Sequence, residues 1–77
     1  MDELRLGIYK HFKGKLYEVI ALARHSETQE EMVVYRALYV HEKFGKDSIW
    51  VRPLKMFLEH LERDGYSGPR FAYVGPK

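Results

Sequence analysis

The chain has 77 residues, the length of one small domain, so we expect residues 1–77 to fold as a single unit with a modest hydrophobic core. Its 45% hydrophobic and 31% charged residues are typical of a folded protein rather than a disordered one, and the absence of cysteine excludes a disulfide framework, a thiolate zinc site and a cysteine nucleophile. The net charge of +2 permits a polyanionic partner but does not argue for one.

The amino-terminal part of the sequence predicts a β-hairpin. Residues 8–12 and 16–24 are rich in aromatic and aliphatic side chains, and Gly14 lies in the short link between them. The second run also fits the spacing of an amphipathic helix. Its β-branched and aromatic residues favour a strand.

A polar stretch at residues 25–31 separates this run from the next apolar one, residues 32–40, and a second hairpin is the expected connection. An alternative takes Ser26 and Gln29 as the capping box of a helix that reaches Tyr39. Consecutive β-branched and aromatic residues in the second half of that helix disfavour the alternative.

The carboxy-terminal part changes from strand to helix periodicity. Residues 48–52 are typical of a strand that Pro53 ends. A helix is predicted over residues 53–64, because apolar residues recur there at helical spacing, Pro53 suits the first helical position and Gly65 suits the position after the end. The run RFAYV, residues 70–74, predicts a final edge strand. Together these elements predict a mainly β fold of four to five short strands with one short helix, arranged as a strongly bent sheet or small barrel.

Most of residues 7–71 consists of three distinctive runs, GIYKHFKGKLYEVIALARHSETQEEMVVYRALY, IWVRPLKMFLE and PRF. These runs resemble a family of short bacterial proteins of unknown function named DUF1653. The resemblance implies a small SH3-like β-barrel, and it implies no catalytic mechanism. The positions that match the family pattern are Gly7, Tyr9, His11, Gly14, Tyr17, Arg24, His25, Ser26, Glu27, Thr28, Tyr35, Trp50, Arg52 and Pro53.

The run RHSET, residues 24–28, contains the residue types of a hydrolytic site. Adjacent residues on a strand point to opposite faces, so Ser26 and His25 are poorly placed to act as a nucleophile and its base. The same side chains are typical of a turn, in which they bond to their own backbone. The catalytic alternative is a small hydrolase-like enzyme in which His25 is the general base and Glu27 orients it, because the two would share one strand face.

Aromatic residues interleaved with arginine give the stronger functional prediction. The chain has six Tyr, four Phe and one Trp, more rings than a core of this size needs. Exposed rings beside arginine form surfaces on which a base, a peptide side chain or a cation stacks. We therefore expect a binding module for a peptide, a nucleic acid or a small anionic ligand, unless Trp50 and several tyrosines pack only in the core or at its rim. The predicted ligand-binding surface consists of Tyr17, Arg24, His25, Glu27, Tyr35, Trp50 and Arg52, with Tyr9 and Tyr39 as further aromatic candidates.

No cofactor and no metal site are predicted, because the four histidines are spread along the chain without a ligand pattern. The longest uninterrupted apolar run has five residues, against the roughly 20 that span a bilayer, and the start of the chain lacks the apolar segment of a signal peptide. We therefore expect a cytoplasmic protein without membrane contact. Because an edge strand can pair with another copy, a monomer and a weak homodimer both stay open.

Overall fold

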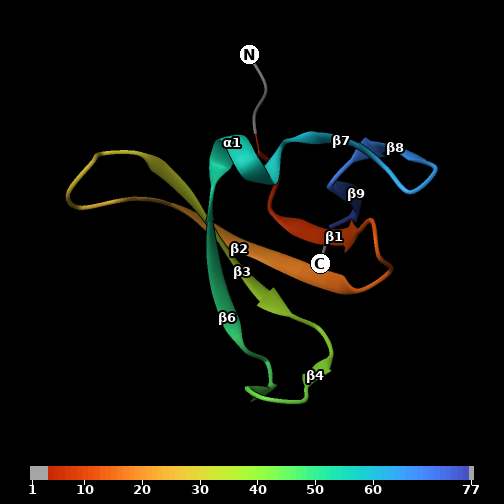
Figure 1. The fold of residues 1–77 in the computed structure, drawn as a ribbon. Helices are drawn as coiled ribbons and strands as arrows, with labels where there is room; N and C mark the ends of the chain where they lie inside the picture. Colours follow the sequence, from red (N-terminus) through yellow and green to blue (C-terminus); the bar gives the residue numbers. More distant parts are fainter. Residues whose placement is uncertain (1–3, 77) are drawn as a thin grey trace.

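The computed structural model describes residues 4–76 and shows a mainly β protein, as the sequence predicts (Figure 1). Nine strands and one short helix follow one another within these residues. Their bounds are β1 (Gly7–His11), β2 (Leu16–Arg24), β3 (Glu31–Ala37), β4 (Val40–His41), β5 (Gly45–Lys46), β6 (Ile49–Pro53), α1 (Leu54–Phe57), β7 (His60–Arg63), β8 (Tyr66–Pro69) and β9 (Phe71–Gly75).

Five strands form one antiparallel sheet in the order β6-β3-β2-β1-β9, with the predicted edge strand β9 beside β1. The outer strands β6 and β9 are not paired with each other in the part of the chain that the structure describes, so the sheet is open and forms no closed barrel. In a flat sheet these two strands would lie about 19 Å apart, at about 4.8 Å per strand. Yet the Arg52 guanidinium of β6 lies 5.7 Å from the centre of the Phe71 ring of β9. The sheet is therefore strongly bent, as predicted.

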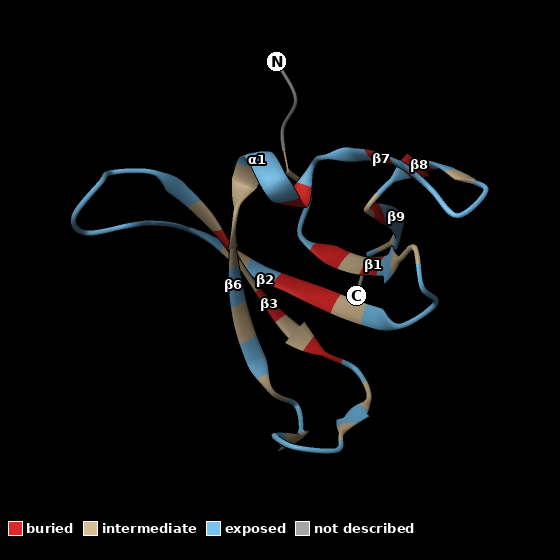
Figure 2. Ribbon diagram, viewed as in Figure 1, coloured by how far each residue is buried: buried red, intermediate tan, exposed pale blue. Residues whose placement is uncertain are grey.

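Both predicted hairpins are present, β1 with β2 and β2 with β3. The two alternative helices are therefore not adopted. A shift of register between Val19 and Ala21 bends the long β2–β3 hairpin. Its far end, drawn in yellow in Figure 1, projects away from the rest of the sheet, and every residue from 24 to 30 is exposed (Figure 2).

The predicted helix over residues 53–64 is wrong in its extent. α1 ends at Phe57, and residues 60–63 belong to β7, which pairs with β8. These two strands are joined by Asp64 and Gly65, whose φ angles of 50° and 80° fit a type I′ hairpin turn. An Asp-Gly pair is a strong hairpin signal, and here its local preference outweighs the helical spacing of the apolar residues before it.

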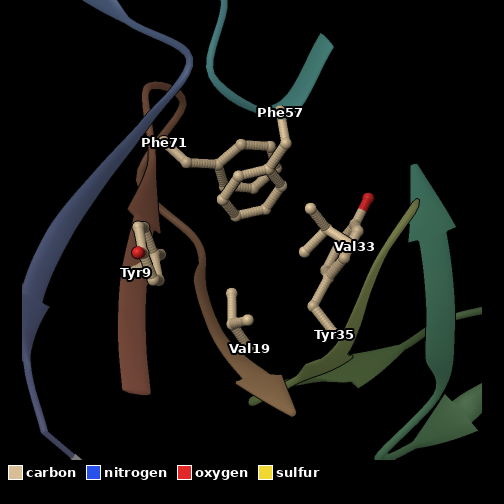
Figure 3. Close-up of a cluster of buried hydrophobic side chains, with 6 residues drawn as sticks. All are labelled: Tyr9, Val19, Val33, Tyr35, Phe57 and Phe71. Carbon is tan, nitrogen blue, oxygen red and sulfur yellow. The ribbon is translucent and has the colours of Figure 1, made fainter. Parts of the chain in front are cut away.

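The core lies on one face of the sheet, which we call the inner face (Figure 3). Phe57, which α1 supplies, is fully buried, and its ring stacks on that of Phe71 with 4.1 Å between the centroids and 6° between the planes. The helix thus covers one end of the inner face, and the end toward β4 lies away from it (Figure 1). The buried cluster consists of Tyr9, Val19, Val33, Tyr35, Phe57 and Phe71.

Candidate functional site

Four of the predicted ligand-binding residues lie together on the inner face, and we call them the inner-face site: Tyr17, Tyr35, Trp50 and Arg52. Tyr35 of β3 pairs directly with Trp50 of β6, and the rings of Tyr17 and Tyr35 lie 5.3 Å apart. Arg52 follows Trp50 by two residues and so points to the same face of β6. Tyr35 is buried in the core, whereas the other three side chains are half-buried. These three can contact both the core and a ligand.

Arg52 is held in place by aromatic groups. Its Nε donates a hydrogen bond of 3.3 Å to the Tyr35 hydroxyl, and its guanidinium lies over the Phe71 ring. Two other arginines of residues 4–76 form ion pairs, Arg36 with Glu18 and Arg70 with Glu59, but Arg52 forms none within this range. The Arg52 charge therefore has no carboxylate partner in the described part of the chain.

A pair of tyrosines connects the inner-face site to the end of the molecule near β4. The hydroxyl groups of Tyr17 and Tyr39 are hydrogen-bonded at 2.7 Å. The pKa of the Tyr17 phenol is raised well above its usual value, first by burial and then by this hydrogen bond. Lys15 is exposed, and its Nζ lies 4.7 Å from the centre of the Tyr39 ring. Tyr17 therefore stays a neutral phenol, which can donate or accept a hydrogen bond.

Beyond Tyr39, the inner face continues into what we call the aromatic rim, made of Tyr39, His41, Phe44 and Trp50. The Trp50 ring lies 5.6 Å from that of His41 and 5.4 Å from that of Phe44. Phe44 is 59% exposed. A hollow of about 320 Å³ is lined by Phe44, Ser48, Ile49 and Trp50, and a second of about 350 Å³ by Lys15, Tyr39, Val40, His41 and Glu42. The rim thus offers open aromatic surface on both sides of His41.

Sequence reasoning missed His41 and Phe44, although one local signal was present. His41 ends β4, and its Nδ1 accepts hydrogen bonds from the backbone N–H groups of Lys43 and Phe44. His11 ends β1 and accepts the N–H two residues later in the same way. A histidine at a strand end thus acts as a turn cap in both places, much as an Asn or Asp side chain does. Here the cap places Phe44 beside Trp50.

The remaining predicted residues, Arg24, His25 and Glu27, lie in the turn between β2 and β3. The Nδ1 atom of His25 accepts hydrogen bonds from the backbone N–H groups of Glu27 at 3.1 Å and Thr28 at 3.3 Å. Arg24 donates from Nη1 to the Gln29 carbonyl oxygen at 2.9 Å. These side chains hold the turn together, as the structural interpretation of RHSET predicts.

The structure brings Tyr17, Tyr35, Trp50 and Arg52 together and places the other three residues in the turn, so a shared ligand-binding role of all seven stays a prediction. Arg24 lies seven residues beyond Tyr17 on β2, or about 23 Å along an extended strand. His25 and Glu27 do not share a strand face, as the catalytic alternative assumed, because β2 ends at Arg24 and residues 26–28 form a turn. The catalytic alternative itself stays a prediction. Ser26 contributes its carbonyl oxygen, which accepts a bond from Gln29. Within residues 4–76, no hydrogen bond or ion pair joins the Glu27 carboxylate to His25.

His11 lies next to the inner-face site, although it was predicted only as a position of the family pattern. Its ring centre lies 6.3 Å from that of Tyr17 and 5.0 Å from that of Phe71. The pKa of His11 is lowered, first by burial and then by the positive charges of Arg52, Arg70 and Lys13. The imidazole is thus neutral at physiological pH in a locally positive environment.

Within the described part of the chain, no group of three or more His, Cys, Asp and Glu side chains is arranged to hold a metal ion. Nor do residues 4–76 contain a helix with the length and apolar character of a membrane span.

Comparison with known proteins identifies the family. Residues 7–73 match the family described as "Protein of unknown function (DUF1653)". The chain is also similar to a DUF1653 protein from Bordetella bronchiseptica with a solved crystal structure, at 37% sequence identity, with 97% of this chain and 92% of that chain covered and a TM-score of 0.86. No curated protein matches. Because the family match spans nearly the whole chain and the solved relative shares both sequence and fold, the protein belongs to the DUF1653 family.

Proposed function

We propose that this protein is a binding module that holds its ligand on the inner-face site and the aromatic rim. One observation carries the proposal: half-buried Tyr17 of β2, Trp50 of β6 and Arg52 of β6 lie on one face that α1 leaves partly uncovered. Among residues 4–76, Arg52 has no carboxylate partner. An arrangement of this kind is typical of surfaces on which flat or charged groups are bound.

The chemistry of the site supports three ligand classes, namely a peptide, a nucleic acid and a small anionic ligand. Trp50 and Phe44 offer ring faces for stacking, at about 1–3 kcal/mol for each nucleobase. The hydroxyl groups of Tyr17 and Tyr39 and the guanidinium of Arg52 offer hydrogen bonds. The ligand would therefore combine a flat apolar group with a polar or charged one.

An NMR titration tests the proposal. Uniformly ¹⁵N-labelled protein is titrated with pools of short peptides and with single-stranded oligonucleotides, and chemical shifts of the backbone and of the Trp50 indole N–H are followed. We expect the shifts to cluster at residues 39–52. Replacing Trp50→Ala is expected to weaken binding about 5- to 150-fold, the equivalent of about 1–3 kcal/mol.

The matched control is Val51→Ala, because Val51 lies next to Trp50 on β6 but on the opposite face, where it is 60% exposed. This variant is expected to bind like the wild type. Shifts confined to the turn at residues 24–29, or equal losses in the two variants, would contradict the proposed site.

A further inference from the structure

We propose that Arg52 is the anchor for an oxyanion of the ligand, a carboxylate or a phosphate group, so that the inner-face site selects ligands that carry one. This inference rests on the proposed function, because it uses the same site, and it adds the chemical class that the site recognises.

The first step is the fixed orientation of the guanidinium. Arg52 lies in β6 opposite Val33, which is fully buried, so its backbone is paired with a core position of β3. Its Nε is bonded to the Tyr35 hydroxyl, and its plane is near the Phe71 ring. These two contacts restrict the rotation of the head group. Binding an anion therefore costs little further side-chain entropy.

The second step is the free edge of the same group. The Nη1 and Nη2 atoms of Arg52 have no hydrogen-bond partner among residues 4–76. They are not buried, whereas the Nε atoms of Arg36 and Arg70 are buried without a partner. An arginine can present two parallel N–H groups, which match the two oxygens of a carboxylate or phosphate. The guanidinium edge is thus available to an anion from solution.

The third step is the local charge. Arg52, Arg70 and Lys13 all act on His11, and the ion pair of Arg70 with Glu59 offsets only one of the three cations. The groups around Arg52 on the inner face are uncharged rings and phenols, namely Tyr17, Tyr35 and Phe71. Uncharged groups around an arginine strengthen its attraction for an anion, because fewer water molecules and countercharges screen the arginine charge.

The test is an NMR titration of the full chain with two separate probes, inorganic phosphate and acetate, at constant ionic strength maintained with chloride. We expect at least one probe to shift the Arg52 Nε–H and the resonances of Tyr17 and His11. Since an anion at Arg52 offsets the cation beside His11, the His11 pKa is expected to rise in its presence. A response to phosphate alone identifies a phosphate ligand, and a response to acetate alone identifies a carboxylate ligand.

Arg52→Gln is expected to weaken the binding of the active probe on the order of 10- to 100-fold, because a hydrogen-bonded charge is lost. Arg63→Gln is the control, since Arg63 is an exposed arginine of β7 outside the site. If Arg52→Gln does not fold, Arg52→Lys decides: it keeps the charge but not the paired N–H groups, and a several-fold loss is expected.

Unchanged binding of the probe in either folded Arg52 variant overturns the inference, as does the absence of a response to both probes. The proposed function can survive that result, because peptides or oligonucleotides can still bind at Trp50. Conversely, binding of the anion at Arg52 without any effect of Trp50→Ala on the larger ligands would contradict the proposed function and leave the anion site standing.

Discussion

The turn between β2 and β3 and the inner-face site both carry arginine and hydroxyl-bearing side chains, but the two regions use them in opposite ways. In the turn, each of these hydrogen bonds joins a side chain to a backbone group only two to five positions away. On the inner face, the Tyr17–Tyr39 and Arg52–Tyr35 bonds connect side chains 22 and 17 positions apart.

This difference explains why the run RHSET, which contains the residue types of a hydrolytic site, serves as a turn in the structure. Adjacent polar residues satisfy one another's backbone and leave few groups for a ligand. Residues brought together by the fold cannot satisfy local backbone, and some of their groups stay available. Convergence of distant residues is thus the better indicator of a binding surface than density along the chain.

Removing the support of the inner face is expected to give the largest effect. Phe57→Ala deletes a ring with 0% exposure that stacks on Phe71, and the loss should be about 3–5 kcal/mol of unfolding free energy. That is a large share of the total stability of about 5–15 kcal/mol typical of a domain. Urea denaturation followed by Trp50 fluorescence measures it.

Met56→Ala is the matched control, because Met56 lies in the same short helix but is 45% exposed. It should cost below about 1 kcal/mol. If the two substitutions had equal effects, α1 would not be the cover of the inner face, and the distinction between the supported face and the free-standing turn would fail.

The Tyr17–Tyr39 hydrogen bond is expected to give the next effect, and a double-mutant cycle isolates it. Tyr17→Phe and Tyr39→Phe each remove one hydroxyl, and each should destabilise the fold by about 0.5–1.5 kcal/mol. The double variant should lose less than the sum of the two, because the same bond is lost in both. Strict additivity in urea denaturation would mean that the hydroxyl groups act independently and that the site is less connected than the structure indicates.

Sequence patterns predicted the strands of the sheet well, because alternation, β-branched residues and turn glycines act locally. The hairpin of β1 and β2, the hairpin of β2 and β3, the strand that Pro53 ends and the edge strand β9 all follow from such signals. The predicted helix is too long because the Asp64-Gly65 pair, which favours a two-residue hairpin turn, outweighs the helical spacing of the apolar residues before it.

The site was predicted only in part, for a different reason. Tyr17, Tyr35, Trp50 and Arg52 were identified by residue type, but their common face depends on the order of strands and on the bend of the sheet. No local pattern contains that information. His41 and Phe44 were missed because their position depends on the small β4–β5 hairpin, which consists of two residues in each strand.

The pH dependence of stability is a further difference that we expect between the inner face and the turn. Because the pKa of His11 is lowered in the fold, the unfolded chain binds a proton more readily, with an ordinary pKa near 6.5. The stabilisation that neutral His11 contributes is therefore fully present above about pH 6.5, and it is lost as the pH falls through the lower pKa of His11 in the folded protein. We expect the urea midpoint to decrease between neutral and mildly acidic pH.

His11→Asn is expected to reduce that decrease. Asparagine does not titrate, and its side-chain oxygen can accept the Lys13 N–H in place of Nδ1. His60→Asn is the control, because His60 is exposed in β7, away from the inner face. An unchanged pH profile in His11→Asn would show that the burial of His11 does not control acid stability.

The smallest effect is expected in the turn itself. His25→Ala removes the acceptor of two backbone N–H groups, but all of residues 24–30 are exposed, so water replaces the lost bonds and the cost should stay below about 1 kcal/mol. Faster hydrogen exchange at the Glu27 and Thr28 amides should be the clearest sign, and His25→Asn, which keeps an acceptor, should restore protection. Ligand shifts at Trp50 and Arg52 should be the same in all three proteins, because the side chains of Arg24 and His25 bond to the backbone of their own turn. If His25→Ala instead abolished binding while the protein stayed folded, the two regions would have to be parts of one site, and the general-base role of His25 would gain support.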